Sequence, residues 1–204
     1  MKGQGNDSLG IELSNNKLKA VWIQRSEKRC RIMAKSIHCL MGPPVKSIRA
    51  LIADLSKGAP QLQLARLPTY MSLSGPLVNR CTLNIEGDIL RLRPYVIDDY
   101  IFARAIESIE RPLDEIFLEY YIVQSKISDA EHTEVMIVWV EKSQVQPYLL
   151  ALKSYRLNVK ALELAEHSNH RFMTKTMSTL PEEMDSEFSI CCGAALREWE
   201  AEDV

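Results

Sequence analysis

The chain has 204 residues, of which 46% are apolar and 25% are charged, and this composition excludes a disordered, collagenous or disulfide-dense chain. With 25 Lys and Arg against 27 Asp and Glu, the net charge is −2. A near-neutral balance gives no electrostatic footprint for nucleic acid or for an acidic membrane surface. The length allows one large domain or two small subdomains.

Glycine is scarce, and its distribution argues against a loop that binds phosphate. The chain has eight glycines, with none between Gly87 and Gly193. Glycine supplies the positive φ and the close backbone approach that a phosphate loop needs. Neither GxGxxG nor GxxxxGK[ST] occurs in the sequence. The pattern therefore excludes a dinucleotide-binding fold and a P-loop NTPase.

The cysteines and the apolar runs indicate the cellular compartment. The five cysteines form no CxxC pair, which is typical of reduced thiols in the cytosol. The polar start of the chain has no signal-peptide pattern. The longest apolar run, 135–140, is far shorter than the roughly 20 residues of a membrane-spanning helix. We therefore expect a cytoplasmic protein that reaches a membrane only through a partner.

Apolar periodicity and turn residues predict a mixed order of strands and helices. The first half reads as a hairpin, a third strand, a helix and two further strands, over 9–13, 18–23, 29–40, 45–57, 62–67 and 76–85. The second half reads as a helix that opens at Asp98-Asp99 and stops at Pro112, followed by further elements. These are two strands, a helix, a strand and two helices, over 115–123, 133–140, 143–155, 157–162, 165–173 and 188–199. The segment 174–187 reads as a polar linker, and 133–140 as a strand in the centre of its sheet.

Several segments together resemble actin-like proteins of the PilM group. Residues 10–21 (GIELSNNKLKAV) resemble the first hairpin of that family, and 109–120 (IERPLDEIFLEY) resemble its helix-to-strand segment. Residues 157–171 resemble the strand and helix beyond it, and 193–197 (GAALR) resemble the closing helix. The order of these matches along the chain carries the resemblance. MshI proteins and the L protein of type II secretion are related families.

The resemblance implies an α/β fold in which a partial actin-like, ribonuclease H-like subdomain carries an inserted ferredoxin-like subdomain. We expect actin-like strands over 1–43, the insert over 44–160 and the terminal helices over 161–204. The family implies a non-enzymatic cytoplasmic scaffold of type IV pilus biogenesis, peripheral at the inner membrane. Its partner would be the N-terminal cytoplasmic tail of a PilN-like protein, with no nucleic acid bound.

The chain departs from the family at the hairpin that would hold phosphate. Glu12 stands where the family has aspartate, and Ser14 replaces a glycine. With Asn15 and Lys19, these residues form a degenerate nucleotide hairpin. The second half of the fold is largely missing, because only a short linker separates Arg171 from the closing helix. Phosphoryl transfer needs positioning and charge neutralisation, so we expect no ATP binding, no cofactor and no catalytic residues.

Two polar groups have alternative interpretations. Glu12 and Lys19 form either a solvated cross-strand pair, which we favour, or a nucleotide contact. Four residues at helical spacing, Glu163, Glu166, His167 and His170, could hold zinc. We favour an ion-paired polar helix face and predict no metal site. The pairs Asp98-Asp99 and Asp114-Glu115 are expected to cap and solvate element ends, and Cys191-Cys192 to lie in a core.

Peptide capture is the expected mechanism. An extended peptide offers backbone hydrogen bonds to a strand edge and places alternate side chains in pockets. The candidate groove residues are Tyr100, Arg104, Pro112 and Tyr120, which flank the segment with the best family match. The alternatives are a degenerate or split actin-like ATP-binding protein, or an L-type component of a type II secretion system.

Overall fold

The chain forms two compact units. The computed structural model describes residues 6–26, 29–58, 67–87, 89–123, 132–179 and 186–199. Unit 1 combines Met1–Pro76 with Gln146–Val204, and unit 2 is the intervening Leu77–Val145. Both are mixtures of helices and strands, so the predicted α/β class is confirmed.

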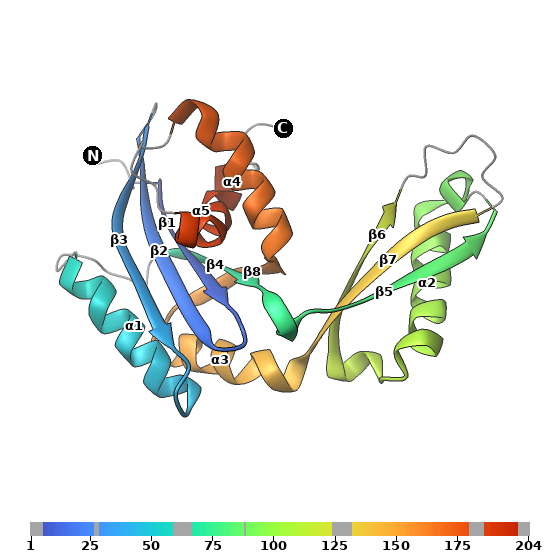
Figure 1. The fold of residues 1–204 in the computed structure, drawn as a ribbon, viewed down its shortest axis with the longest axis horizontal. Coiled ribbons are helices and arrows are strands. Elements are labelled where there is room, and N and C mark those ends of the chain that lie inside the picture. The colour runs from blue at the N-terminus through green and yellow to red at the C-terminus, as the bar shows by residue number, and fades with distance from the viewer. Residues whose placement is uncertain are drawn as a thin grey trace. The chain divides into compact units, whose positions relative to one another are not determined.

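Unit 1 is built on a five-stranded sheet with the strand order β3-β2-β1-β4-β8 (Figure 1). The strands are β1 (Asn6–Leu13), β2 (Lys17–Ser26), β3 (Arg29–Cys39), β4 (Pro68–Leu73) and β8 (Asn158–Leu164). β2 is antiparallel to both of its neighbours, β1 and β3. β4 runs parallel to both β1 and β8.

Helices cover both faces of this sheet (Figure 1). One face carries α1 (Pro44–Gly58) and α3 (Lys142–Ser154), and the other carries α4 (Ala165–Thr179) and α5 (Ser189–Ala195). α1 forms because Ile48, Leu51 and Leu55 recur at helical spacing, and all three are buried. β1 lies in the middle of the sheet and is buried on both faces.

Unit 2 is a three-stranded antiparallel sheet with one long helix. The elements are β5 (Asn79–Glu86), α2 (Pro94–Ile109), β6 (Ile116–Val123) and β7 (His132–Glu141). β7 pairs with both other strands, which confirms its predicted central place. The buried face of α2 packs Ile97, Ile101, Ala105 and Ile109 into the core of this unit.

The insert is shorter than the predicted 44–160. The expected boundary placed α1, β4 and the first residues of β8 in the insert. In the structure β4 pairs with both β1 and β8 in the first sheet, and α1 packs on β2 and β3. Only Leu77–Val145 forms the separate unit. The limits of the insert depend on strand pairing between segments that are distant in sequence, and local apolar periodicity does not predict such pairing.

Two helices differ from their predicted positions, and one strand was not predicted. The unpredicted strand is β4, whose residues after Pro68 are buried on both faces and so show no alternation. The strand predicted over 62–67 lies outside the described residues except for Leu67. α2 begins at Pro94, one turn before the predicted Asp98, because proline suits the first helical turn. α4 continues to Thr179, into the segment predicted as linker.

Candidate functional site

The β1–β2 hairpin is closed by its own serine. The Ser14 backbone N–H donates to the Lys17 carbonyl at 2.9 Å, and its Oγ donates to the same carbonyl at 3.1 Å. Asn15 and Asn16 at the tip are exposed. Ser14 therefore uses its hydroxyl within the turn, and Asn15 makes no hydrogen bond with a residue that the structure describes.

Glu12 and Lys19 form the predicted cross-strand pair, but the pair is buried. Glu12 is 4% exposed, and its Oε2 lies 3.3 Å from Lys19 Nζ. Glu12 Oε1 accepts a hydrogen bond from Ser74 Oγ at 2.8 Å. We expected a solvated pair, but Ser74, just after β4, binds Glu12, and the Glu187 carbonyl, just before α5, binds Lys19, so the pair is largely shielded from water.

The short helix Ser186–Phe188, which precedes α5, lies against this hairpin. Lys19 Nζ donates to the Glu187 carbonyl at 2.9 Å, and Lys17 Nζ lies 3.8 Å from the Glu187 carboxylate. Lys35 Nζ lies 5.1 Å from the centre of the Phe188 ring, within cation–π range. Both lysines of β2 that could face an anionic ligand are therefore engaged with the chain itself.

α5 packs unusually close to the sheet and to α4. A Cβ on Gly10 would collide with the Cys191 carbonyl oxygen, and a Cβ on Gly193 would collide with the Ser168 carbonyl oxygen. Ser8 Oγ donates to the Ala195 carbonyl at 2.6 Å. Backbones in such contact leave no volume for a ligand between β1 and α5.

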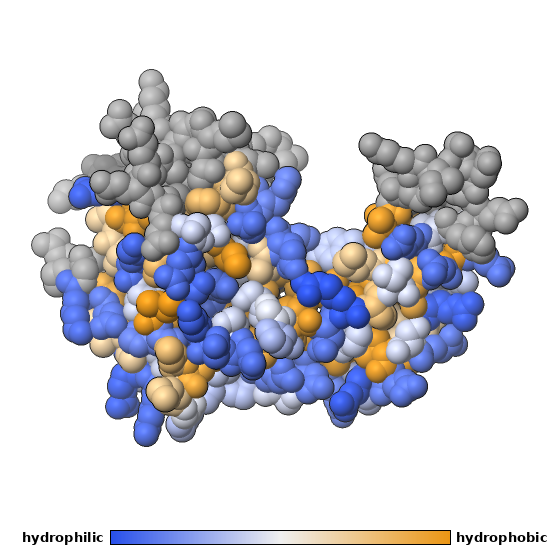
Figure 2. Space-filling view, viewed as in Figure 1, coloured by the Kyte–Doolittle hydropathy of each residue, from blue (hydrophilic) through white to orange (hydrophobic). Residues whose placement is uncertain are grey.

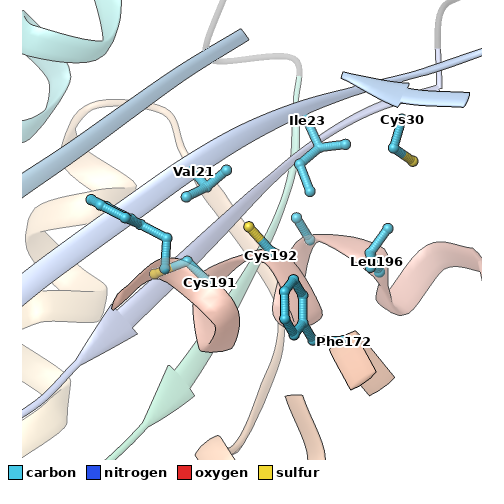
Figure 3. Packing of buried hydrophobic residues seen from close by; sticks show 9 residues of the cluster. Val21, Ile23, Cys30, Phe172, Cys191, Cys192 and Leu196 are labelled. Atoms are coloured by element: carbon cyan, nitrogen blue, oxygen red, sulfur yellow. The ribbon is translucent and has the colours of Figure 1, made fainter. Parts of the chain in front are cut away.

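Cys191 and Cys192 lie in the core, as predicted (Figure 3). Cys192 points toward Val21 and Ile23 of β2 (Figure 3). Burial raises the pKa of Cys192 to about 12 and that of Cys191 well above its ordinary value. Because a thiol attacks as the thiolate, neither cysteine is suited to be a nucleophile.

A buried carboxylate joins β8, α4 and the end of α5. Glu163 Oε1 and Oε2 accept hydrogen bonds from the Arg171 guanidinium at 2.9 and 3.2 Å, and Arg197 Nη1 donates to Oε2 at 2.8 Å. Ser168 Oγ also donates to Oε1. Arg171 Nη1 donates further to the Gly193 carbonyl at 2.9 Å. The network links β8, α4, α5 and the short helix Leu196–Trp199. Glu163 and Arg171 are close in the sequence, but Gly193 and Arg197 lie 22 residues or more from their partners, so local patterns do not predict the network.

The structure does not bring together the four residues of the alternative zinc site. Glu163 belongs to β8, so it is not on one helix with Glu166, His167 and His170 as assumed. Glu166 and His170 are exposed, whereas Glu163 is buried. Within the described residues, no three His, Cys, Asp or Glu side chains lie close enough to hold a metal ion.

In unit 2, Tyr120 of β6 contacts one flank of α2. Tyr120 Oη donates to Asp98 Oδ1 at 2.5 Å, and its ring meets the Phe102 ring edge-on with centroids 6.1 Å apart. The hydrogen bond to Asp98 raises the pKa of Tyr120, and burial adds to the shift. Asp98 and Phe102 are four residues apart and so lie on the same face of α2. This spacing could have predicted a shared partner for the two residues.

Tyr100 and Arg104 lie on the other flank of α2. The Arg104 guanidinium sits 5.9 Å from the Tyr100 ring centre and also donates to Glu107 at 3.1 Å. Residues 98 and 100 differ by about 200° around a helix, so this pair faces away from Tyr120. Pro112 is exposed and lies between α2 and β6. The structure therefore brings Tyr100 and Arg104 together but places Tyr120 on the other flank of α2, so the four predicted groove residues do not form one set.

The strand order and helical layers of unit 1 define an actin-like, ribonuclease H-like sheet, and the similarity to one solved structure supports this fold. The chain is similar to one in the PilM–PilN type IV pilus biogenesis complex, with a TM-score of 0.57, 16% identity, and coverage of 81% of this chain and 49% of that chain. It also matches the cytoplasmic domain of EpsL, an inner membrane component of the type II secretion system of Vibrio cholerae. There the TM-score is 0.48, the identity is 13%, and the match covers 79% of this chain and 58% of the other.

The chain thus spans about half the length of the PilM–PilN complex chain that it matches. No protein-family model matches the sequence, and no curated protein matches it. No helix in the described part of the chain is both long enough and apolar enough to cross a membrane.

Proposed function

We propose that the chain is a non-enzymatic adaptor of type IV pilus biogenesis that binds an extended cytoplasmic segment of a PilN-like inner-membrane protein. The observation that carries the proposal is the fold shared, over 81% of the chain, with a chain of a PilM–PilN complex. The ordered sequence resemblance to the PilM group supports the same function. The adaptor would lie in the cytoplasm, held at the inner membrane through its partner.

The edge of the unit 2 sheet is suited to a peptide. β6 is an edge strand, because its partner β7 lies on one side and no other described strand pairs with it. Edge strands present unpaired N–H and C=O groups that an extended peptide can match. Side chains along β6 alternate, so a peptide there would meet different side chains on the two faces of the sheet.

Tyr120 and Pro112 are the expected contacts of such a peptide. Tyr120 is half-buried beside Phe102, and Pro112 is exposed just before β6 begins. Tyrosine is enriched among residues that dominate binding energy. Tyr100 and Arg104, on the other flank of α2, would not reach a peptide that lies along β6.

A binding measurement with flank-specific variants tests this placement. The ligand is a synthetic peptide of the N-terminal cytoplasmic tail of the membrane protein encoded next to this chain, titrated by calorimetry. We expect Phe102→Ala with Tyr120→Ala to weaken binding at least about tenfold. The matched control, Tyr100→Ala with Arg104→Ala on the other flank, should change it less than about threefold.

The two possible failures have different meanings. If the control weakens binding and the Phe102 and Tyr120 variant does not, the peptide lies on the other flank and the adaptor proposal survives. If the wild-type chain binds no peptide from its neighbouring membrane protein, the adaptor proposal is wrong. Melting temperatures of both variants show whether either result comes from unfolding.

The absence of enzymatic activity is part of the proposal. The space beside the hairpin holds the Glu12–Lys19 pair and the Glu187 carbonyl, which support a closed site. We expect no ATP hydrolysis by the purified chain above a denatured control, with or without magnesium. Glu12→Asp with Ser14→Gly should gain none, because these changes leave Lys19 engaged. Measurable turnover would favour the alternative, a degenerate or split ATP-binding protein.

A further inference from the structure

The charges of the chain are strongly segregated. Residues 1–76 hold 12 Lys or Arg against 4 Asp or Glu, whereas 77–145 hold 7 against 13. A net charge of −2 therefore hides a basic first part and an acidic middle. Residues 146–204, the other part of unit 1, hold 6 Lys or Arg against 10 Asp or Glu, so the positive excess of unit 1 lies in residues 1–76. The net charge of the chain does not report this local excess.

α1 turns a basic side to solvent. Lys46, Arg49, Ala53 and Lys57 recur at helical spacing opposite the buried side of the helix, and all four are exposed. Asp54 is the single acidic residue of α1, and its carboxylate contacts Lys57 at 2.8 Å and His38 at 2.8 Å. The outward side of α1 is thus left with an excess of positive charge.

The C-terminal part of α3 continues this surface. Arg49 Nε donates to Tyr155 Oη at 3.1 Å, which joins α1 to the end of α3. Lys153 and Arg156 nearby are exposed. In the part of the chain that the structure describes, no carboxylate pairs with Lys46, Lys153 or Arg156. We call Lys46, Arg49, Lys57, Lys153 and Arg156 the basic face.

Apolar side chains stand among these charges. Met41, just before α1, is 83% exposed, Leu150 of α3 is 59% exposed, and Val45 at the start of α1 is 45% exposed. Figure 2 shows mostly hydrophilic side chains over α1 and α3 with apolar ones between them. Exposed apolar residues within a basic surface are typical of elements that lie in the headgroup region of a membrane.

We propose that the basic face docks on an anionic lipid surface, with Met41 and Leu150 entering the headgroup region. Clusters of four to eight Lys and Arg on an amphipathic helix bind anionic lipid, each contributing through the surface potential. Nucleic acid fits less well, since single strands are bound by stacking on aromatic side chains and the basic face has none beyond the half-buried Tyr155. The proposal concerns unit 1, so it can fail independently of peptide binding by unit 2.

Vesicle sedimentation with the full chain tests the proposal. The probes are phosphatidylcholine vesicles with and without one third phosphatidylglycerol, in about 0.1 M salt so that distant charges are screened. We expect binding only to the anionic vesicles and a loss of roughly 100-fold in Lys46→Glu with Arg49→Glu and Lys153→Glu. The matched control changes the same charge in unit 2, with Arg91→Glu, Arg93→Glu and Arg111→Glu. It should lose less than about tenfold, because these three arginines are not part of the basic face.

A second variant separates lipid from other anionic partners. Met41→Ser with Leu150→Ser leaves the charge unchanged and should weaken vesicle binding by about tenfold through lost apolar burial. Binding to polyglutamate should be unaffected. Failure of the wild type to bind anionic vesicles, or equal losses in both charge variants, would overturn the proposal. Tight binding to polyglutamate or RNA without vesicle binding would assign the face to an acidic protein or a nucleic acid instead. Circular dichroism verifies that each variant is folded.

Discussion

Units 1 and 2 bury their sheets in different ways. Unit 1 places helices on both faces of five strands, and the polar side chains of its interior contact one another. Unit 2 places one long helix beside three strands, and two of those strands are edges. Among its described residues, six large apolar side chains are exposed, namely Leu92, Tyr95, Tyr100, Ile106, Leu113 and Phe117, against five in the larger unit 1. The hairpin that would bind nucleotide in an actin-like protein is therefore closed, whereas unit 2 keeps surface available for a partner.

The carboxylates of the two units show the same contrast. Glu163 of unit 1 is buried and bound by two arginines, whereas Glu107 of unit 2 is exposed and bound to Arg104. Removing one partner of a buried ion pair leaves the other charge uncompensated and away from water. In an exposed pair, water solvates the charge that remains. Neutralising a carboxylate should therefore lower the free energy of unfolding far more in unit 1 than in unit 2.

The largest expected effect is that of Glu163→Gln. Neutralising the carboxylate leaves the buried Arg171 without its counter-charge, and we expect a loss of about 3–5 kcal/mol in the free energy of unfolding of unit 1. The matched change Glu107→Gln should cost less than about 1 kcal/mol. Urea unfolding, followed by hydrogen exchange in each unit, measures both losses. Equal losses in the two variants would contradict the contrast between a closed and an open unit.

The glycines sharpen the comparison further. Gly10→Ala in unit 1 places a Cβ on the Cys191 carbonyl, so the backbone of α5 must move, and we expect a loss of about 3 kcal/mol or slightly less. Gly87→Ala in unit 2 meets no atom within 4 Å and is strained only by its φ of +86°. That strain should cost about 1–2 kcal/mol. Thermal unfolding of the two variants compares them, and a smaller loss at Gly10 would show that α5 is packed less closely than described.

Much of the fold could be predicted because it is local. The hairpin of β1 and β2, the central place of β7 and the apolar face of α2 all follow from periodicity within short windows. β4 was not predicted, because a strand buried on both faces shows no alternation. The limits of the insert depended on pairing between β4 and β8, which lie far apart in the sequence.

The candidate site was predictable only in part, for the same reason. The pairing of Glu12 with Lys19 follows from hairpin register, but its burial depends on Ser74 and Glu187, which are distant in sequence. Glu163 was assigned to a helix because β8 and α4 are contiguous and no turn residue separates them. Net charge likewise concealed the basic face, since an average over the chain cancels opposite regions.

The smallest expected effect concerns the cysteines and depends on pH. Burial raises the pKa of Cys192 in unit 1 to about 12, and it also raises the pKa of the half-buried Cys81 in unit 2. An unfolded thiol has a pKa of about 8.5, so above that pH the unfolded state releases a proton that the folded state keeps. The stabilising contribution of the protonated thiol is complete below about pH 8.5 and is lost as the pH rises toward 12.

Comparison with Cys192→Ala isolates this contribution from other groups that titrate in alkali. We expect the stability advantage of the wild-type chain over Cys192→Ala to fall by about 1–2 kcal/mol between pH 8.5 and 10. The corresponding fall for Cys81→Ala should be smaller, because Cys81 is only half-buried and water still reaches its thiolate. Urea unfolding at the two pH values measures both differences. A larger pH dependence at Cys81 than at Cys192 would mean that the interior of unit 2 excludes water better than the layer under α5, which would reverse the contrast between the two units.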